Sequence, residues 1–206
     1  YGNPIELPIR EESAKNPINP YAQTKLDKEK LAIKFAKDGV KIIGLRYLNI
    51  FGEGQSKEYA GVIKLFLERI QQKLPPKING DGLQARDFVY VGDVVSANIL
   101  SMDSDVNHTF FNVGTGTKIS ILEIAKIMIK YSGLNLEPIF GPPLKGDVNI
   151  TLADISHIQN KLNWISKNNE ECNKIALNGF NDFIKNYTDE LNYDLLINIY
   201  NNALNK

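Results

Sequence analysis

Apolar residues recur at helical spacing in several segments of the chain. Over residues 20–38, Leu31 and Phe35 stand four positions apart among many lysines, which predicts an amphipathic helix. Asn19 is a suitable N-cap ahead of a proline at the first helical position, and Gly39 is a suitable C-cap. Further helices are expected over 59–73, 93–102, 120–131, 154–164, 170–187 and 190–205.

Three of these helices have recognisable starts. Ser120 and Glu123 have the spacing of a capping box, and we expect Asp93 and Asp154 to cap their helices. Short β-branched apolar runs lie between the helices and predict buried strands over 42–45, 77–79, 88–91 and 110–113. The alternation of helix and strand predicts an α/β fold with a parallel sheet.

Composition narrows the class of protein. The chain has 206 residues, of which 43% are hydrophobic and 23% charged, as in an ordinary globular protein. Its formal net charge of zero gives no reason to expect a nucleic-acid partner, and no apolar run is long enough to span a membrane. The single cysteine excludes an internal disulfide and a cysteine-based zinc cluster, so we expect a cytoplasmic protein without a metal site.

Tyr21 and Lys25 form the pair that carries candidate chemistry. Residues four apart lie on one face of a helix, which places the lysine ammonium near the phenol. A nearby cation favours a phenolate, and a general base requires activation of this kind. The alternative is an ordinary helix surface with a half-buried tyrosine and a solvated lysine, because this spacing often arises by chance.

The surrounding blocks resemble a known family. Residues 19–25 and the Leu45–Gly52 segment match, in order and spacing, the extended short-chain dehydrogenase/reductase family. Further blocks follow in the family's order at 80–82, 86–94, 111–116 and 146–156. Over residues 1 to about 187 the chain is most similar to NAD-dependent nucleotide-sugar epimerases of the UDP-glucose 4-epimerase type.

This resemblance implies roles for residues that would contact the cofactor. Tyr21 would be the catalytic base, and Lys25 would hold the nicotinamide ribose of NAD. Tyr47 would line the nicotinamide pocket, although packing against the sheet would also account for it. In such enzymes NAD takes a hydride from the sugar while the tyrosine takes the hydroxyl proton.

The resemblance also implies three residues for the nucleotide-sugar substrate. Asn49 would contact its phosphates, Arg86 would pair with the diphosphate, and Asp147 would hold a ribose hydroxyl. A guanidinium suits a diphosphate because it is planar and permanently charged. The alternatives are that Asn49 forms a turn, that Asp147 is a plain loop residue, and that Arg86 pairs on the surface with Asp87 or Asp81.

The fold implied is the C-terminal part of a Rossmann-type parallel sheet with a smaller α/β substrate-binding domain. We expect residues 1–52 to belong to the NAD-binding domain, joined by parts of 80–116, and residues 53–206 to bind mainly the nucleotide-sugar. The family's glycine-rich NAD loop and catalytic Ser/Thr precede the position of Tyr1, so we expect most of the NAD site to lie outside this chain. The resemblance further implies a homodimer.

Residues 80–85 fit a G-x-G-x-x-A pattern but do not predict a dinucleotide loop. Such a loop must open a helix, whereas a strand pattern follows here. Two departures from the epimerases, Leu144 and the pair Glu53-Gly54, stand where many members carry arginine, which lowers the positive charge expected near a diphosphate. The alternatives that remain are an ADP-heptose 6-epimerase-like protein, a sugar dehydratase, or a catalytically inactive nucleotide-sugar-binding remnant.

Overall fold

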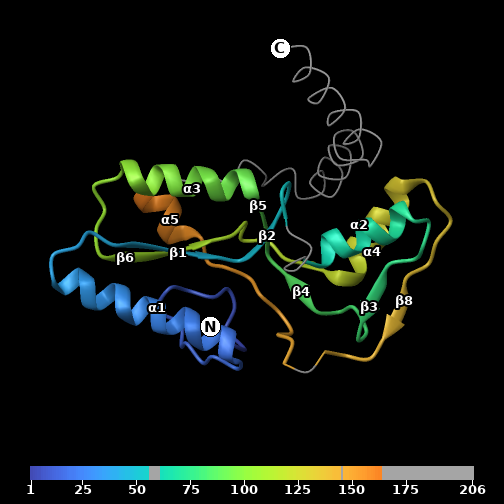
Figure 1. The fold of residues 1–206 in the computed structure, drawn as a ribbon, viewed down its shortest axis with the longest axis horizontal. Coiled ribbons are helices and arrows are strands. Elements are labelled where there is room, and N and C mark those ends of the chain that lie inside the picture. The colour runs from blue at the N-terminus through green and yellow to red at the C-terminus, as the bar shows by residue number, and fades with distance from the viewer. Residues whose placement is uncertain (56–60, 145, 164–206) are drawn as a thin grey trace, which may run out of the picture.

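The computed structural model describes residues 1–55, 61–144 and 146–163 and has the expected α/β class (Figure 1). In chain order the elements are α1 (Pro20–Lys37), β1 (Ile43–Tyr47), β2 (Asn49–Phe51), α2 (Val62–Gln71), β3 (Lys77–Asn79), β4 (Ala85–Arg86), β5 (Phe88–Tyr90), α3 (Val91–Asp103), β6 (Thr109–Val113), β7 (Ile119–Ser120), α4 (Ile121–Ser132), β8 (Ile139–Gly141) and α5 (Ser156–Leu162). The helices expected over 170–187 and 190–205 lie outside the described residues.

One hydrophobic core forms around strands β1 and β6. These strands run parallel, with Ile43 opposite Thr109 and Tyr47 opposite Val113, and β2 pairs in parallel with β5. Helices α3 and α5 cover one face of β1 and β6, while α1 lies on the other side (Figure 1). The buried residues of this first core are Val89, Val94, Ala97, Phe111, Val113, Ala153, Ile155, Ile158 and Leu162.

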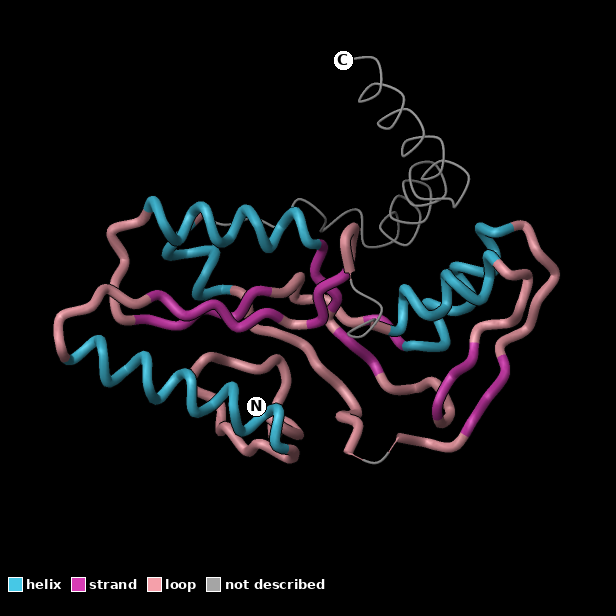
Figure 2. The backbone as a smooth tube through the Cα atoms, in the orientation of Figure 1, coloured by secondary structure: helices cyan, strands magenta, loops and turns pink. Residues whose placement is uncertain are grey.

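A second core lies between helices α2 and α4. Figure 2 shows these helices beside the parallel pair β3 and β8, in the part of the molecule away from α1. Strands β4 and β7 pair antiparallel, and β7 leads directly into α4. The buried residues of this second core are Phe66, Leu67, Ile70, Ile78, Ile121, Ile124, Ala125, Met128 and Ile129.

Local capping signals are confirmed in α1 and α4. The Asn19 side chain accepts a hydrogen bond from the amide of Ala22, and a proline opens α1 as expected. Ser120 and Glu123 form both hydrogen bonds of the capping box at the start of α4. Residues 80–84 form a loop that leads into strand β4 and not into a helix, so the rejection of residues 80–85 as a dinucleotide loop is also confirmed.

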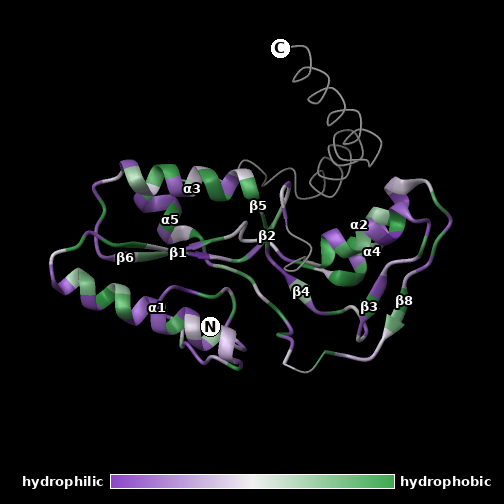
Figure 3. Ribbon diagram, viewed as in Figure 1, coloured by the Kyte–Doolittle hydropathy of each residue, from purple (hydrophilic) through white to green (hydrophobic). Residues whose placement is uncertain are grey.

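Three expectations about helices are wrong. Asp154 does not cap α5, because Ile155 occupies the N-cap position, although Asp154 Oδ1 accepts a hydrogen bond from the amide of Ser156 at 2.9 Å. Asp93 does not cap α3, because the helix already begins at Val91 and Asp93 is a buried residue of its first turn. The apolar positions of α1 are not buried either: Leu31 is 53% exposed and Phe35 is 48% exposed. Hydrophilic and hydrophobic bands alternate along this helix (Figure 3). No helix in the described part of the chain has the length and apolar character needed to cross a membrane.

Candidate functional site

The first turns of α1 present Tyr21 and Lys25 to solvent. The capped start at Asn19 fixes where the helix begins, and the next turn brings the Lys25 Nζ to 4.9 Å from the centroid of the Tyr21 ring. The ammonium therefore lies over the aromatic ring, in a cation–π geometry. The expectation that both side chains share one face of a helix is confirmed.

Both side chains are accessible to a ligand. Tyr21 is 69% exposed, and Lys25 is exposed as well. An exposed phenol beside an ammonium can exchange a proton with a bound hydroxyl group, and the ammonium can hold a second hydroxyl of the same ligand. The catalytic roles of these two residues remain predictions.

Arg86 and Asp147 are brought together although they are 61 positions apart. The Arg86 Nη2 lies 2.5 Å from Asp147 Oδ1, and the side chains are 11% and 38% exposed. Arg86 Nη1 also donates to the backbone carbonyl of Asn149 at 3.2 Å. The partner of Arg86 is thus another predicted substrate residue, and neither Asp87 nor Asp81 takes that place. A fixed guanidinium beside a carboxylate can bind phosphate oxygens and a hydroxyl group side by side.

Asn49 lies in β2 and not in a turn, which removes the turn-former alternative. Its amide Nδ2 donates to the Thr151 hydroxyl at 3.2 Å, and its backbone amide donates to the carbonyl of Asp87 at 3.0 Å. Thr151 in turn donates its backbone amide to the carbonyl of Ala85, next to Arg86. Hydrogen bonds therefore connect Asn49 with the strand that carries Arg86 and with the segment that follows Asp147.

Asp87 is a central residue of this region that the sequence did not identify. Its side chain is fully buried, and it accepts hydrogen bonds from the amide and hydroxyl of Thr115 at 2.7 and 2.8 Å. The amides of Gly116 and Ala153 add bonds of 3.1 and 3.2 Å. Burial raises the pKa of the Asp87 carboxyl, and the hydrogen bonds from Thr115, Ala153 and Gly116 act in the opposite direction.

A glycine makes room for the Asp87 carboxylate. A Cβ atom at Gly114 would lie 2.7 Å from Asp87 Oδ2 and 3.1 Å from the Cβ of Ala153. The loop after β6 can therefore approach the carboxylate only without a side chain at this position. A charged residue at the start of an otherwise apolar strand, together with the later Gly-Thr-Gly, was the available sequence signal.

Tyr47 is not brought next to Tyr21. Its hydroxyl donates to Asn98 Oδ1 of α3 at 3.0 Å, and its neighbour Arg46 contacts Glu29 of α1. Successive residues of a strand point to opposite faces, so Tyr47 lies on the α3 face and Tyr21 on the α1 side. The expected place of Tyr47 in a nicotinamide pocket stays a prediction.

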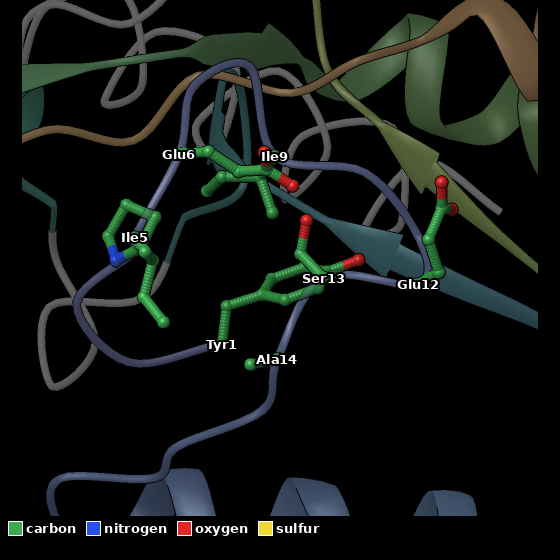
Figure 4. A pocket seen from close by; sticks show the side chains of 8 residues that line it. Tyr1, Ile5, Glu6, Ile9, Glu12, Ser13 and Ala14 are labelled. Atoms are coloured by element: carbon green, nitrogen blue, oxygen red, sulfur yellow. The ribbon is translucent and has the colours of Figure 1, made fainter.

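The two departures from the epimerases are both accessible. Glu53 accepts hydrogen bonds from the Tyr90 hydroxyl at 2.9 and 3.1 Å, and Leu144 is 60% exposed. A cavity of about 250 Å³ opens elsewhere, in the N-terminal loop (Figure 4). None of the six predicted site residues lines it; its residues are Tyr1, Pro4, Ile5, Glu6, Ile9, Glu12, Ser13 and Ala14.

The chain is similar in sequence to a known protein family and to several of its members. Residues 1–114 match the model of the NAD dependent epimerase/dehydratase family. The UDP-glucose 4-epimerase of Lactobacillus helveticus is 32% identical over 198 residues, which cover 85% of this chain and 59% of that protein.

Two solved structures are similar over most of the chain. The UDP-N-acetylglucosamine 4-epimerase from Methanobrevibacter ruminantium in complex with UDP-N-acetylmuramic acid has a TM-score of 0.83 at 31% identity, covering 90% of this chain and 60% of its own. The UDP-glucuronic acid 4-epimerase from Bacillus cereus with UDP-glucuronic acid and NAD has a TM-score of 0.79 at 27% identity, covering 87% and 57%. The Rossmann-type α/β fold is thus confirmed, and the chain spans about three fifths of the length of the first curated relatives that it matches.

Proposed function

Because the chain belongs to the NAD-dependent epimerase/dehydratase family, we propose that its protein is an enzyme that inverts the configuration at C4 of a UDP-sugar. The relatives named above act on UDP-sugars that differ in the sugar and share the inversion at C4. The observation that carries the proposal is the exposed Tyr21–Lys25 pair at the start of α1, which lies within the matched residues.

In this proposal Tyr21 handles the proton of the reaction. Its phenolate accepts the proton of the sugar's C4 hydroxyl when C4 is oxidised, and returns that proton when C4 is reduced from the opposite face. The Lys25 ammonium stabilises the phenolate and binds a ribose hydroxyl of the cofactor. NAD, the cofactor of the family, supplies the hydride transfer when it is bound. Tyr21 and Lys25 fit such a ligand because both are exposed on one helix face.

Arg86 and Asp147 are proposed to bind the nucleotide part of the substrate. The Arg86 guanidinium pairs with the diphosphate, and the Asp147 carboxylate accepts a hydrogen bond from a ribose hydroxyl. Their contact of 2.5 Å orients the guanidinium before substrate arrives. Asn49 completes this group at the phosphates, held by its hydrogen bond to Thr151.

The test uses the product of the complete reading frame that contains this sequence. Incubation with NAD and UDP-glucose, UDP-glucuronate or UDP-N-acetylglucosamine should give the C4 epimer, detected by proton NMR of the anomeric signals. A product that has lost water would indicate a dehydratase instead. In a parallel incubation with an ADP-heptose, inversion at C6 would indicate the other epimerase class.

Matched tyrosine variants test the proposed base. Tyr21→Phe keeps the ring and should lower turnover by about 10²–10⁴-fold, while the KM for the UDP-sugar changes little. Tyr131→Phe removes the hydroxyl of another exposed tyrosine, on α4, and should leave turnover unchanged. Near-normal turnover of Tyr21→Phe would end the proposed mechanism.

A further inference from the structure

Helix α1 forms an ion pair with the sheet. Within residues 1–55, 61–144 and 146–163, no side chain of α1 is buried. Over the same residues, Glu29 is the α1 side chain that forms an ion pair with another element. Its two carboxylate oxygens face Arg46 of β1, with 2.7 Å from Arg46 Nε to Oε1 and 2.9 Å from Nη2 to Oε2. This bidentate geometry fixes direction as well as distance.

Arg46 is itself held in place from several sides. Its Nη1 donates to the Tyr1 hydroxyl at 2.8 Å and to the Glu11 carbonyl at 2.7 Å. Its guanidinium lies 4.9 Å from the centroid of the Phe110 ring and 5.3 Å from that of Tyr1. The side chain of Arg46 is 13% exposed and that of Glu29 22%, so the pair is largely shielded from water. Glu29 therefore meets a rigid partner.

The same helix face carries Glu29 and the proposed catalytic pair. Tyr21, Lys25 and Glu29 follow one another in steps of four residues, so they lie along one side of α1. Side-chain tips stand about 5–6 Å from a helix axis, so a rotation of α1 by about 10° would move the tips on this face by about 1 Å. A displacement of that size can cost an enzyme about 100-fold in rate.

We propose that Glu29 and Arg46 are positioning residues, which fix the rotation of α1 and thereby place Tyr21 and Lys25 against the reacting sugar. The inference rests on the proposed function, because it acts through Tyr21. Neither residue of the pair needs to touch substrate or cofactor. An ion pair that only stabilised the fold would leave the chemistry of the folded enzyme unchanged.

The helix provides a matched control. Asp27 and Lys30 form a second ion pair on α1, with 3.3 Å between Lys30 Nζ and Asp27 Oδ1, and both side chains are more than half exposed. This pair stays within the helix and does not reach the sheet. Asp27→Asn thus removes the same kind of charge from the same helix as Glu29→Gln, without changing a contact to β1.

The experiment compares these variants in the product of the complete reading frame. Glu29→Gln should lower kcat about tenfold or more, with the KM for the UDP-sugar within about twofold of the wild type. Asp27→Asn should leave both constants unchanged. The charge swap Glu29→Arg with Arg46→Glu should recover part of the lost kcat, because the pair is re-formed in the reverse sense. Glu29→Asp, which keeps the charge on a shorter side chain, should give an intermediate kcat and serves if Glu29→Gln does not fold.

A second readout does not depend on turnover. In hydrogen exchange of the 206-residue chain, Glu29→Gln should speed exchange of the α1 amides, while Asp27→Asn should not. Equal kcat values for Glu29→Gln and Asp27→Asn, or equal exchange of α1 in both, would overturn the inference. If the wild type is an active epimerase and Tyr21→Phe is inactive, such a result would refute the positioning role of Glu29 and leave the proposed function intact. A wild type without epimerase activity would overturn both.

Discussion

Asp87→Asn should lower the free energy of unfolding by about 2–4 kcal/mol. The fully buried carboxylate accepts four hydrogen bonds, two at each oxygen. An asparagine keeps one of these oxygens, so two of the four donors lose their acceptor and face an amide NH₂. Each unsatisfied buried donor costs about 1–3 kcal/mol.

One effect acts in the opposite direction. Burial raises the pKa of the Asp87 carboxyl, which means that burying its charge costs free energy, and the neutral amide avoids that cost. We expect the lost hydrogen bonds to outweigh this gain because the backbone amides of Thr115 and Ala153 are buried and have no water to replace the lost acceptor.

Urea unfolding of the 206-residue chain, followed by circular dichroism at neutral pH, measures the difference. The midpoint should fall while the slope with denaturant stays the same, because the variant exposes the same surface on unfolding. Glu53→Gln is the control: its exposed carboxylate accepts hydrogen bonds from Tyr90, and its loss should cost less than about 0.5 kcal/mol. An unchanged midpoint for Asp87→Asn would refute the reasoning.

Four further outcomes are expected. The 206-residue chain should carry no NAD after purification, since its sequence has no glycine-rich loop that opens a helix; stoichiometric NAD in the absorbance of the denatured chain would contradict this. Arg86→Ala should weaken UDP binding about tenfold or more by calorimetry on the product of the complete reading frame, because a charge-assisted hydrogen bond contributes about 1.5–3 kcal/mol. Hydrogen bonds from the Ser120 hydroxyl and amide hold the pKa of the Glu123 carboxyl below its usual value. The capping box therefore stabilises α4 above about pH 4, and this stabilisation is lost as the pH falls through the lowered pKa. In acid unfolding, Glu123→Gln should therefore lose less stability with falling pH than the wild type. Gly44→Ala should cost about 1–3 kcal/mol in thermal unfolding, because its Cβ would lie 2.2 Å from the Phe110 ring, and adding Phe110→Leu should recover part of that loss.

Elements whose signals are local could be predicted from the sequence. The Asn19 cap, the Ser120 capping box and the strand over 77–79 depend on residues within four positions of each other, and all three are present. Strands β4 and β7 were not predicted because each has two residues, too few to show an alternating pattern.

The candidate site was predicted residue by residue but not as an arrangement. Arg86 and Asp147 were both named, yet no pattern in the sequence indicated that they would pair across 61 positions. Asp87 was taken only as an alternative surface partner of Arg86, because burial depends on the loops at 114–116 and 153 that fold over it. The burial of the apolar face of α1 was also predicted wrongly, because an amphipathic pattern does not show which element packs against that face.

The segment from Asp147 to Asp154 forms hydrogen bonds with two parts of the chain that are far apart in the sequence. It is hydrogen-bonded to β4 through Ala85, and its far end pairs with Ile9 through the bonds from Ile9 N to the Leu152 carbonyl and from Asp154 N to the Ile9 carbonyl. Figure 1 shows this stretch running from the β3–β8 side to the α1 side. A ligand that binds Asp147 would therefore restrain a segment whose other end is hydrogen-bonded to the N-terminal loop. Slower amide exchange near Ile9 would then report nucleotide binding from outside the binding site itself.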